Sequence, residues 1–113
     1  METREKLLKS FNCPTILAQN LIGGKWKILI IWQLRNEVKR FNELLKKLPD
    51  IKQAYLTKQL RELEQDGIIH REVYKVVPPK VEYSLTPIGK KLLYALFELR
   101  KWGLEYMDFI SDK

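Results

Sequence analysis

The 113-residue chain has only one cysteine and one histidine. One cysteine cannot form a disulfide within the chain, and the two residues together cannot supply the four ligands of a zinc site. The longest apolar block, "ILIIW" at residues 28–32, is too short to cross a bilayer, and the first residues lack the pattern of a signal peptide. We therefore expect a soluble cytoplasmic protein that holds no metal and contacts no membrane.

Catalytic signatures are missing as well. The chain has no glycine-rich phosphate loop, no paired carboxylates in a plausible cleft and no Ser/His/Asp order of a catalytic type. His70 stands in a predicted strand with no second histidine or cysteine near it, so we interpret it as an ordinary strand residue. Trp26, Trp32 and Trp102 are expected in the core or in a dimer interface. The sequence thus predicts neither an enzyme nor a cofactor.

Positive charge is abundant and unevenly distributed. The net charge is +7 and the isoelectric point is near 9.5, which favours a polyanionic partner. Residues 39–61 carry a net charge of +5, whereas residues 92–113 carry −1. Hydrophobic residues make up 45% of the chain, enough for the core of one domain. These features point to a nucleic acid that binds near residues 39–61.

Apolar residues recur at helical spacing over most of the chain. The spacing predicts helices over residues 3–11, 14–22, 25–35 and 40–48, and a further helix within residues 51–66 that ends before Gly67. Residues 25–35 are apolar nearly all round, as in a buried central helix. The two helices joined by "PDIK" match a helix-turn-helix, in which the second helix is offered to the partner.

That second helix has two different faces. Leu56, Leu60 and Leu63 form a narrow apolar stripe that is expected to dock on the core. The other face is rich in hydrogen-bond donors and short of carboxylates, and it carries Ala54, Thr57, Lys58, Arg61 and Gln65. Such side chains read base edges in the major groove. The competing interpretation is an ordinary solvated face, on which Glu62 and Glu64 pair with Lys58 and Arg61.

A hairpin and a long helix complete the predicted fold. Residues 68–75 and 80–85 have the composition of strands, and "VVPP" between them predicts a rigid tip. Thr86 as N-cap and Pro87 at the first helical position then begin a helix that reaches about residue 110. This helix is apolar on more than one face, so we expect a second copy of the chain to cover it.

Four blocks of the sequence, in this order and spacing, resemble the HxlR-type transcriptional regulators, a winged-helix group related to the MarR regulators. They are "CPTILAQNLIGGKWKILI", "RFNELLKKLPDI", "LTKQLRELEQDGII" and "VPPKVEYSLTPIGKKL". The resemblance implies a mainly α fold with a small β-hairpin wing, that is, a winged helix-turn-helix that is dimeric through its N- and C-terminal helices. It also implies a double-stranded DNA operator, repression more often than activation, and a small-molecule or oxidant inducer in some members.

The resemblance sets the predicted domain organisation. We expect a single winged-helix domain over residues 1–113, with the helix-turn-helix and wing at about 39–85 and dimerisation helices at about 1–22 and 87–110. Two positions depart from many relatives. Lys52 replaces the serine that usually caps the recognition helix, so Asp50 or a backbone arrangement takes that role. The segment "RNEVKRF" replaces a turn that contains glycine.

The predicted DNA contacts come from the helix-turn-helix and the wing. Tyr55 lies beside the reading face, where it reaches a phosphate or packs on the wing, and Arg71 lies further down the strand than the two wing lysines. A basic wing commonly follows the backbone or enters the minor groove, although a hairpin that merely closes the sheet is an alternative, above all for Val76 and Val77. The predicted contact residues are Arg40, Lys52, Gln53, Ala54, Tyr55, Thr57, Lys58, Arg61, Lys75 and Lys80.

Cys13 is the candidate redox sensor. It precedes Pro14 and is therefore expected to cap the helix at 14–22, where the helix dipole and free backbone N–H groups stabilise a thiolate. Some members of the resembling family sense oxidants or electrophiles through a cysteine at the matching position. The alternative is a small apolar residue buried at the dimer interface.

Three hypotheses about function follow. The leading one is a homodimeric, sequence-specific DNA-binding regulator. The second is a winged-helix module that binds proteins without specific DNA binding, and the basic stretch at 39–61 argues against it. The third is an RNA-binding protein, disfavoured because the exposed face lacks the stacking aromatics of single-strand recognition.

Overall fold

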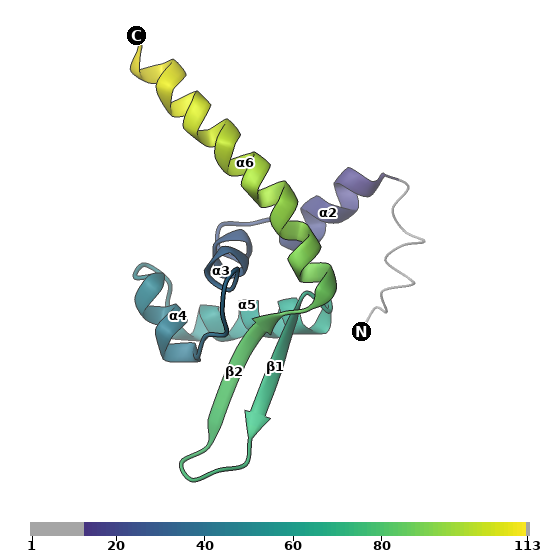
Figure 1. The fold of residues 1–113 in the computed structure, drawn as a ribbon, viewed down its shortest axis with the longest axis vertical. Coiled ribbons are helices and arrows are strands. Elements are labelled where there is room, and N and C mark those ends of the chain that lie inside the picture. Colours follow the sequence, from purple (N-terminus) through teal and green to yellow (C-terminus); the bar gives the residue numbers. More distant parts are fainter. Residues whose placement is uncertain (1–12, 113) are drawn as a thin grey trace.

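The computed structural model describes residues 13–112, so the helix expected over residues 3–11 lies outside the described part. The described residues form five helices and one two-stranded sheet (Figure 1). In chain order they are α2 (Pro14–Ile22), α3 (Lys27–Gln33), α4 (Phe41–Lys47), α5 (Gln53–Gln65), β1 (Ile69–Tyr74), β2 (Lys80–Leu85) and α6 (Pro87–Ser111). The predicted winged helix-turn-helix is confirmed, with α4 and α5 as its two helices and the hairpin as its wing.

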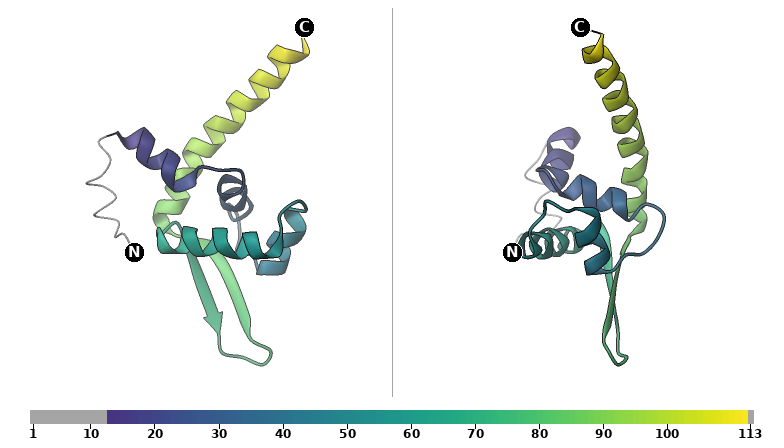
Figure 2. Two further views of the ribbon diagram at one scale, coloured as in Figure 1. Left: turned by 180° about the vertical axis from the view of Figure 1, so that it is seen from behind. Right: turned by 90° about the vertical axis from the view of Figure 1, so that its left-hand side faces the viewer.

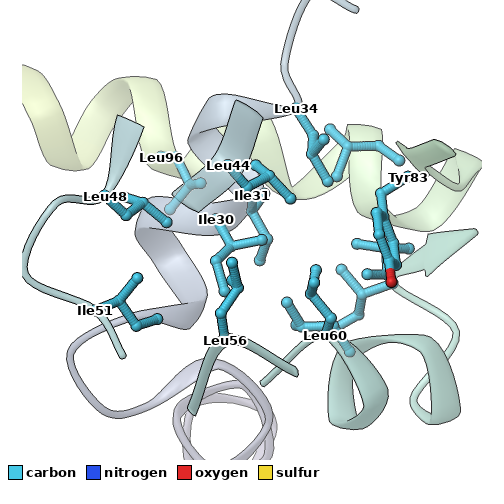
Figure 3. Close-up of a cluster of buried hydrophobic side chains, with 14 residues drawn as sticks. Ile30, Ile31, Leu34, Leu44, Leu48, Ile51, Leu56, Leu60, Tyr83 and Leu96 are labelled. Atoms are coloured by element: carbon cyan, nitrogen blue, oxygen red, sulfur yellow. The ribbon is translucent and has the colours of Figure 1, made fainter. Parts of the chain in front are cut away.

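The core gathers side chains from α3, α4, α5 and the hairpin, with Leu96 from α6 (Figure 3). Leu56, Leu60 and Leu63 are buried, so the inward stripe predicted for α5 is confirmed. The prediction for α3 is wrong in part, because this helix spans seven residues and Leu29 on it is exposed. An apolar sequence pattern marks buried and interface positions alike, and therefore cannot tell which side of α3 the core covers.

The ends of α4 and α5 are capped differently. Glu43 accepts a hydrogen bond from the backbone N–H of Arg40 at 2.9 Å, which satisfies one free donor at the start of α4. Lys52 is the N-cap residue of α5, and no side chain caps this helix. The Asp50 carboxylate therefore does not replace the missing serine as a side-chain cap, and the first N–H groups of α5 stay available to an anion.

The wing is an antiparallel hairpin whose register runs from Ile69 opposite Leu85 to Tyr74 opposite Lys80. A short bridge between Lys39 and Tyr83 adds the segment before α4 to its edge. Because neighbouring positions along a strand point to opposite faces, one face of the hairpin packs on α5 and the other faces away. The two views of Figure 2 show the hairpin projecting from the body near α5.

α6 begins where the sequence predicts it. The Thr86 hydroxyl accepts a hydrogen bond from the N–H of Gly89 at 3.2 Å and lies 2.6 Å from the carbonyl oxygen of Gly67, to which it donates. A side chain at Gly89 would clash with the carbonyl oxygen of Ile68, so the first turn of α6 packs directly on the backbone before β1. The far half of α6 projects from the body in the direction opposite to the hairpin (Figures 1 and 2).

Two general features concern the whole described part. None of its helices combines the length and the apolar composition that crossing a bilayer requires. Within residues 13–112, no three histidine, cysteine or carboxylate side chains come close enough together to hold a metal ion.

Candidate nucleic-acid interface

The outward face of α5 holds the side chains predicted to read bases. Gln53, Ala54 and Lys58 are exposed, and Thr57 is half-buried with its hydroxyl donating to the Gln53 carbonyl oxygen at 3.1 Å. Tyr55 is exposed as well, beside this face. Because α5 lies on the side of the body from which the hairpin projects (Figure 1), the helix and the wing can meet one partner together.

The basic residues of this face lack acidic partners. Among the described residues, neither Lys58 nor Arg61 forms an ion pair. Glu62, one of their two candidate partners in the sequence, instead lies 2.7 Å from the ammonium group of Lys27. The pairing expected under the solvated-face interpretation is therefore wrong for the described residues, and the positive charge of Lys58 and Arg61 is available to an anionic partner.

Two further cations lie at helix starts. Arg40 is the N-cap residue of α4 and Lys52 is the N-cap residue of α5, and both side chains are exposed. Each cation stands beside backbone N–H groups that point out of the helix, and cations and N–H groups both attract phosphate oxygens. Arg40 and Lys52 are thus exposed cations at the starts of the two helices of the helix-turn-helix.

The two wing lysines differ in exposure and in their neighbours. Lys75 is exposed at the hairpin tip, near Val77, which is 99% exposed. Lys80 is half-buried, with its ammonium 3.6 Å from the Glu82 carboxylate and 4.6 Å from the centre of the Tyr74 ring. The Glu82 carboxylate also raises the pKa of the Tyr74 phenol through a hydrogen bond. Glu82 therefore offsets part of the charge that Lys80 brings to the wing.

A polar hollow between α5 and the hairpin contains residues that the sequence prediction left out. Its lining includes Arg71 and Tyr83 from the hairpin beside Arg61 from α5. Arg71 and Tyr83 are directly opposite in the strand register, so they share one face. The alternation of side chains along the strands could have grouped these two residues, but their approach to Arg61 depends on how the hairpin packs on α5.

The surface of α6 is apolar far beyond the core. Its exposed side chains include Tyr94, Phe97, Trp102 and Phe109, and the Trp102 and Tyr106 rings stack with their centres 5.2 Å apart. An apolar groove of about 440 Å³ runs between α3 and α6. Trp26 and Trp32 pack against the core as predicted, whereas Trp102 is 60% exposed. Within residues 13–112, no segment covers this surface.

Cys13 occupies the predicted position. It is the N-cap residue of α2 with Pro14 at the first helical position, and its side chain is exposed. The backbone N–H groups of Ile16 and Thr15 lie near the sulfur and lower the pKa of the Cys13 thiol, although the thiol makes no capping hydrogen bond. Exposure and a lowered pKa are the two conditions for a reactive thiolate.

Comparison with known proteins covers nearly all of the described part. The family model of the HxlR-like helix-turn-helix matches residues 21–111. The HTH-type transcriptional regulator YdeP of Bacillus subtilis (strain 168) is 53% identical over 99 residues, which span 88% of this chain and 77% of YdeP.

Solved structures of similar proteins share the fold. The redox regulator HypR in its reduced form has a TM-score of 0.84 and 46% sequence identity, over 89% of this chain and all of that chain. The diamide-treated form of YodB from Bacillus subtilis has a TM-score of 0.71 and 38% identity, over 83% of this chain and 94% of that chain.

Proposed function

The chain belongs to the HxlR-like helix-turn-helix family of transcriptional regulators, and from this premise we propose that it is a sequence-specific repressor that binds double-stranded DNA as a homodimer. One observation carries the proposal. The outward face of α5 presents Lys58 and Arg61 without acidic partners among the described residues, beside Gln53 and Ala54. Such side chains suit the base edges and the bordering phosphates of the major groove, which admits one α-helix.

The other predicted contact residues lie outside the reading face of α5, and we assign them to the DNA backbone. Arg40 and Lys52 at the helix starts, Tyr55 beside the reading face, and Lys75 and Lys80 on the wing meet the sugar-phosphate backbone. Contacts of this kind fix the position of the protein on the duplex and carry no sequence information. The helix-turn-helix and wing at about residues 39–85 then form the DNA-binding unit of a single winged-helix domain over residues 1–113.

A second copy of the chain is the proposed cover for α6. The far half of this helix has no neighbour in the described part and exposes a row of aromatic and aliphatic side chains. Residues 92–113 carry a net charge of only −1, so two such helices would pack with little repulsion. The dimerisation helices proposed at about 1–22 and 87–110 would place two recognition helices on one operator.

Cys13 is the proposed point of redox or electrophile control. Two structural relatives are the redox regulator HypR and YodB, and the structure of YodB is of its diamide-treated form. In this chain the thiol is exposed and its pKa is lowered at the start of α2. Oxidants and electrophiles are therefore the proposed inducers, and they act on the thiolate of Cys13.

The proposal is tested by selecting binding sites from random duplexes with the purified protein, and by a gel shift on the DNA upstream of its own gene. The expected result is an enriched two-fold symmetric sequence that is bound in preference to a scrambled duplex of equal length. Equal and weak binding to every duplex would contradict sequence-specific regulation and favour the alternative of a winged-helix module that binds proteins.

A further inference from the structure

A polar hollow of about 290 Å³ lies between the C-terminal half of α5 and the hairpin. It has room for a phosphate group together with several water molecules. Cationic and hydroxyl side chains from two separate elements converge on it. The lining residues are Thr57, Leu60, Arg61, Glu64, Arg71 and Tyr83.

The strand register places Arg71 at this hollow. Arg71 lies directly opposite Tyr83 on the neighbouring strand, and cross-strand partners project from the same face of a sheet. Tyr83 packs against the core with only 9% of its surface exposed, so this face is the one turned toward α5. His70 and Glu72 alternate with Arg71 along the strand and project from the other face.

Three polar side chains around the hollow, those of Arg61, Arg71 and Tyr83, have no partners in the described part of the chain. Arg61 and Arg71 make no ion pair there, and the Tyr83 hydroxyl makes no hydrogen bond. Among the described residues, every fully buried side-chain polar atom has a hydrogen-bond partner. Because the Tyr83 hydroxyl has none, it must be accessible to solvent and not enclosed in the core. Figure 3 shows the Tyr83 oxygen at the edge of the hydrophobic cluster, near Leu60. The Arg61 and Arg71 guanidinium groups and the Tyr83 hydroxyl therefore face the hollow as hydrogen-bond donors without an acceptor in the described part of the chain.

An oxyanion satisfies this set of donors. A guanidinium group presents planar pairs of N–H donors that match phosphate oxygens, and a phenol adds one more donor. Glu64 also lines the hollow, and its carboxylate repels any anion that enters. A small free anion would be held poorly against this repulsion, whereas a phosphate fixed in a duplex is held by many other contacts. The occupant that fits is a phosphate of the DNA backbone.

Building on the DNA-binding function proposed above, we propose that the hollow holds one backbone phosphate, bound jointly by Arg61 and Arg71 with the Tyr83 hydroxyl as a third donor. Arg61 then positions the recognition helix instead of reading a base. Base readout falls to the N-terminal half of α5, where Gln53, Ala54 and Lys58 are exposed. Because one phosphate contacts both α5 and the hairpin, it fixes the position of both elements on the same strand of DNA.

The test compares four proteins, namely the wild type, Arg61→Ala, Arg71→Ala and the double variant. Each is measured by fluorescence anisotropy on a selected duplex and on a scrambled duplex over a range of salt concentrations. Each single variant should weaken binding to both duplexes by the same factor, roughly tenfold. The double variant should reduce the slope of log K against log salt by about 0.9, the value for one phosphate, and not by about 1.8.

Matched variants control for charge and folding. Lys101→Ala removes one positive charge from an exposed position on α6 and should leave the salt slope unchanged. Tyr83→Phe keeps the ring in the core, removes only the hydroxyl, and should weaken binding to both duplexes by an equal, smaller factor. Glu64→Gln removes the repulsive carboxylate and should strengthen binding to both. Circular dichroism confirms that each variant is folded.

Replacing the duplex phosphates one at a time with uncharged methylphosphonate identifies the bound group. One position should weaken binding of the wild type and have no effect on the double variant. The assignment is overturned if Arg61→Ala loses preference at one base pair, or if the double variant loses about 1.8 from the salt slope. Saturable binding of inorganic phosphate alone to the wild type, followed by NMR, would assign the hollow to a free anion and overturn it too.

Failure of the phosphate assignment can be distinguished from failure of the proposed function. A wild-type protein that shows no sequence preference among duplexes contradicts specific regulation. A wild-type protein with a clear preference, together with an altered selected sequence for Arg61→Ala, contradicts only the phosphate assignment.

Discussion

The ammonium group of Lys27 lies 2.7 Å from a carboxylate oxygen of Glu62, and this ion pair joins the start of α3 to the recognition helix α5. The Lys27 side chain is 11% exposed and that of Glu62 is 37% exposed, so the two partners have unequal access to water. Removing the carboxylate leaves a buried ammonium without its partner, whereas removing the ammonium leaves a carboxylate that water can reach.

The unequal burial of the two partners predicts that replacing Glu62 and replacing Lys27 lower the free energy of unfolding by different amounts. Glu62→Gln should lower the free energy of unfolding by about 1–3 kcal/mol, because it leaves a buried charged donor with a weaker acceptor. Lys27→Met should cost less, since its apolar side chain occupies a similar volume. Urea titrations of both variants give the comparison. A larger loss for Lys27→Met would mean that the ammonium makes other contacts that stabilise the fold.

The inward stripe of α5 predicts a second effect on stability. Leu60 is 2% exposed, so Leu60→Ala should lower the free energy of unfolding by about 2–5 kcal/mol, as a large-to-small change in a core does. Gln65→Ala on the exposed side of the same helix is the control and should change stability by no more than about 0.5 kcal/mol. Equal effects of the two changes would contradict the orientation of α5 in this fold.

The recognition helix was predictable because local and tertiary signals agree in it. The leucine spacing and the glycine that follows α5 specify the helix and its buried side, and Pro14 and Pro87 mark two other helix starts. The pairing of Glu62 was not predictable, because helical spacing offers Lys58 as its partner while Lys27 approaches only after α3 packs on α5. For the same reason the sequence did not group Arg61 with Arg71 and Tyr83.

Lys58 is expected to contribute to sequence discrimination. It is exposed on the N-terminal half of α5 and has no ion-pair partner among the described residues. Lys58→Ala should cost about 1–3 kcal/mol on the selected duplex, cost less on a scrambled duplex, and relax preference at one base position. Lys75→Ala on the wing tip is the comparison, because a backbone contact should weaken binding to both duplexes alike. Equal losses on the two duplexes for Lys58→Ala would make it a backbone contact as well.

The proposed dimer predicts a variant that separates folding from assembly. Tyr106 stacks on Trp102 in the part of α6 that projects from the body, so Tyr106→Glu should leave the core intact. A charge on a buried apolar interface is costly, and sedimentation should therefore show a shift from dimer to monomer together with weaker operator binding. Lys101→Gln lowers the net charge of α6 by the same one unit at a polar position and is the control. An unchanged dimer for Tyr106→Glu would place the interface elsewhere. Deleting residues from Leu92 onward is a poorer test, because it also removes the buried Leu96.

The last prediction concerns Cys13 as a switch. Because the N–H groups of Ile16 and Thr15 lower the pKa of the thiol, the thiolate is the major form at a lower pH than for a free cysteine. The rate of alkylation should therefore rise with pH through a midpoint below that of a free thiol, and diamide or peroxide should modify Cys13 readily at neutral pH.

With one cysteine per chain, the reversible products are a sulfenic acid, a mixed disulfide with a small thiol, or a disulfide between two chains. Each adds bulk or a covalent link at the start of α2, next to the proposed dimer interface. Oxidation should release the operator, reduction should restore binding, and Cys13→Ser should bind without responding. If mass spectrometry shows a fully modified Cys13 and the operator affinity is the same before and after oxidation, the cysteine does not control binding, because the modification is then present without any effect on the DNA-binding face.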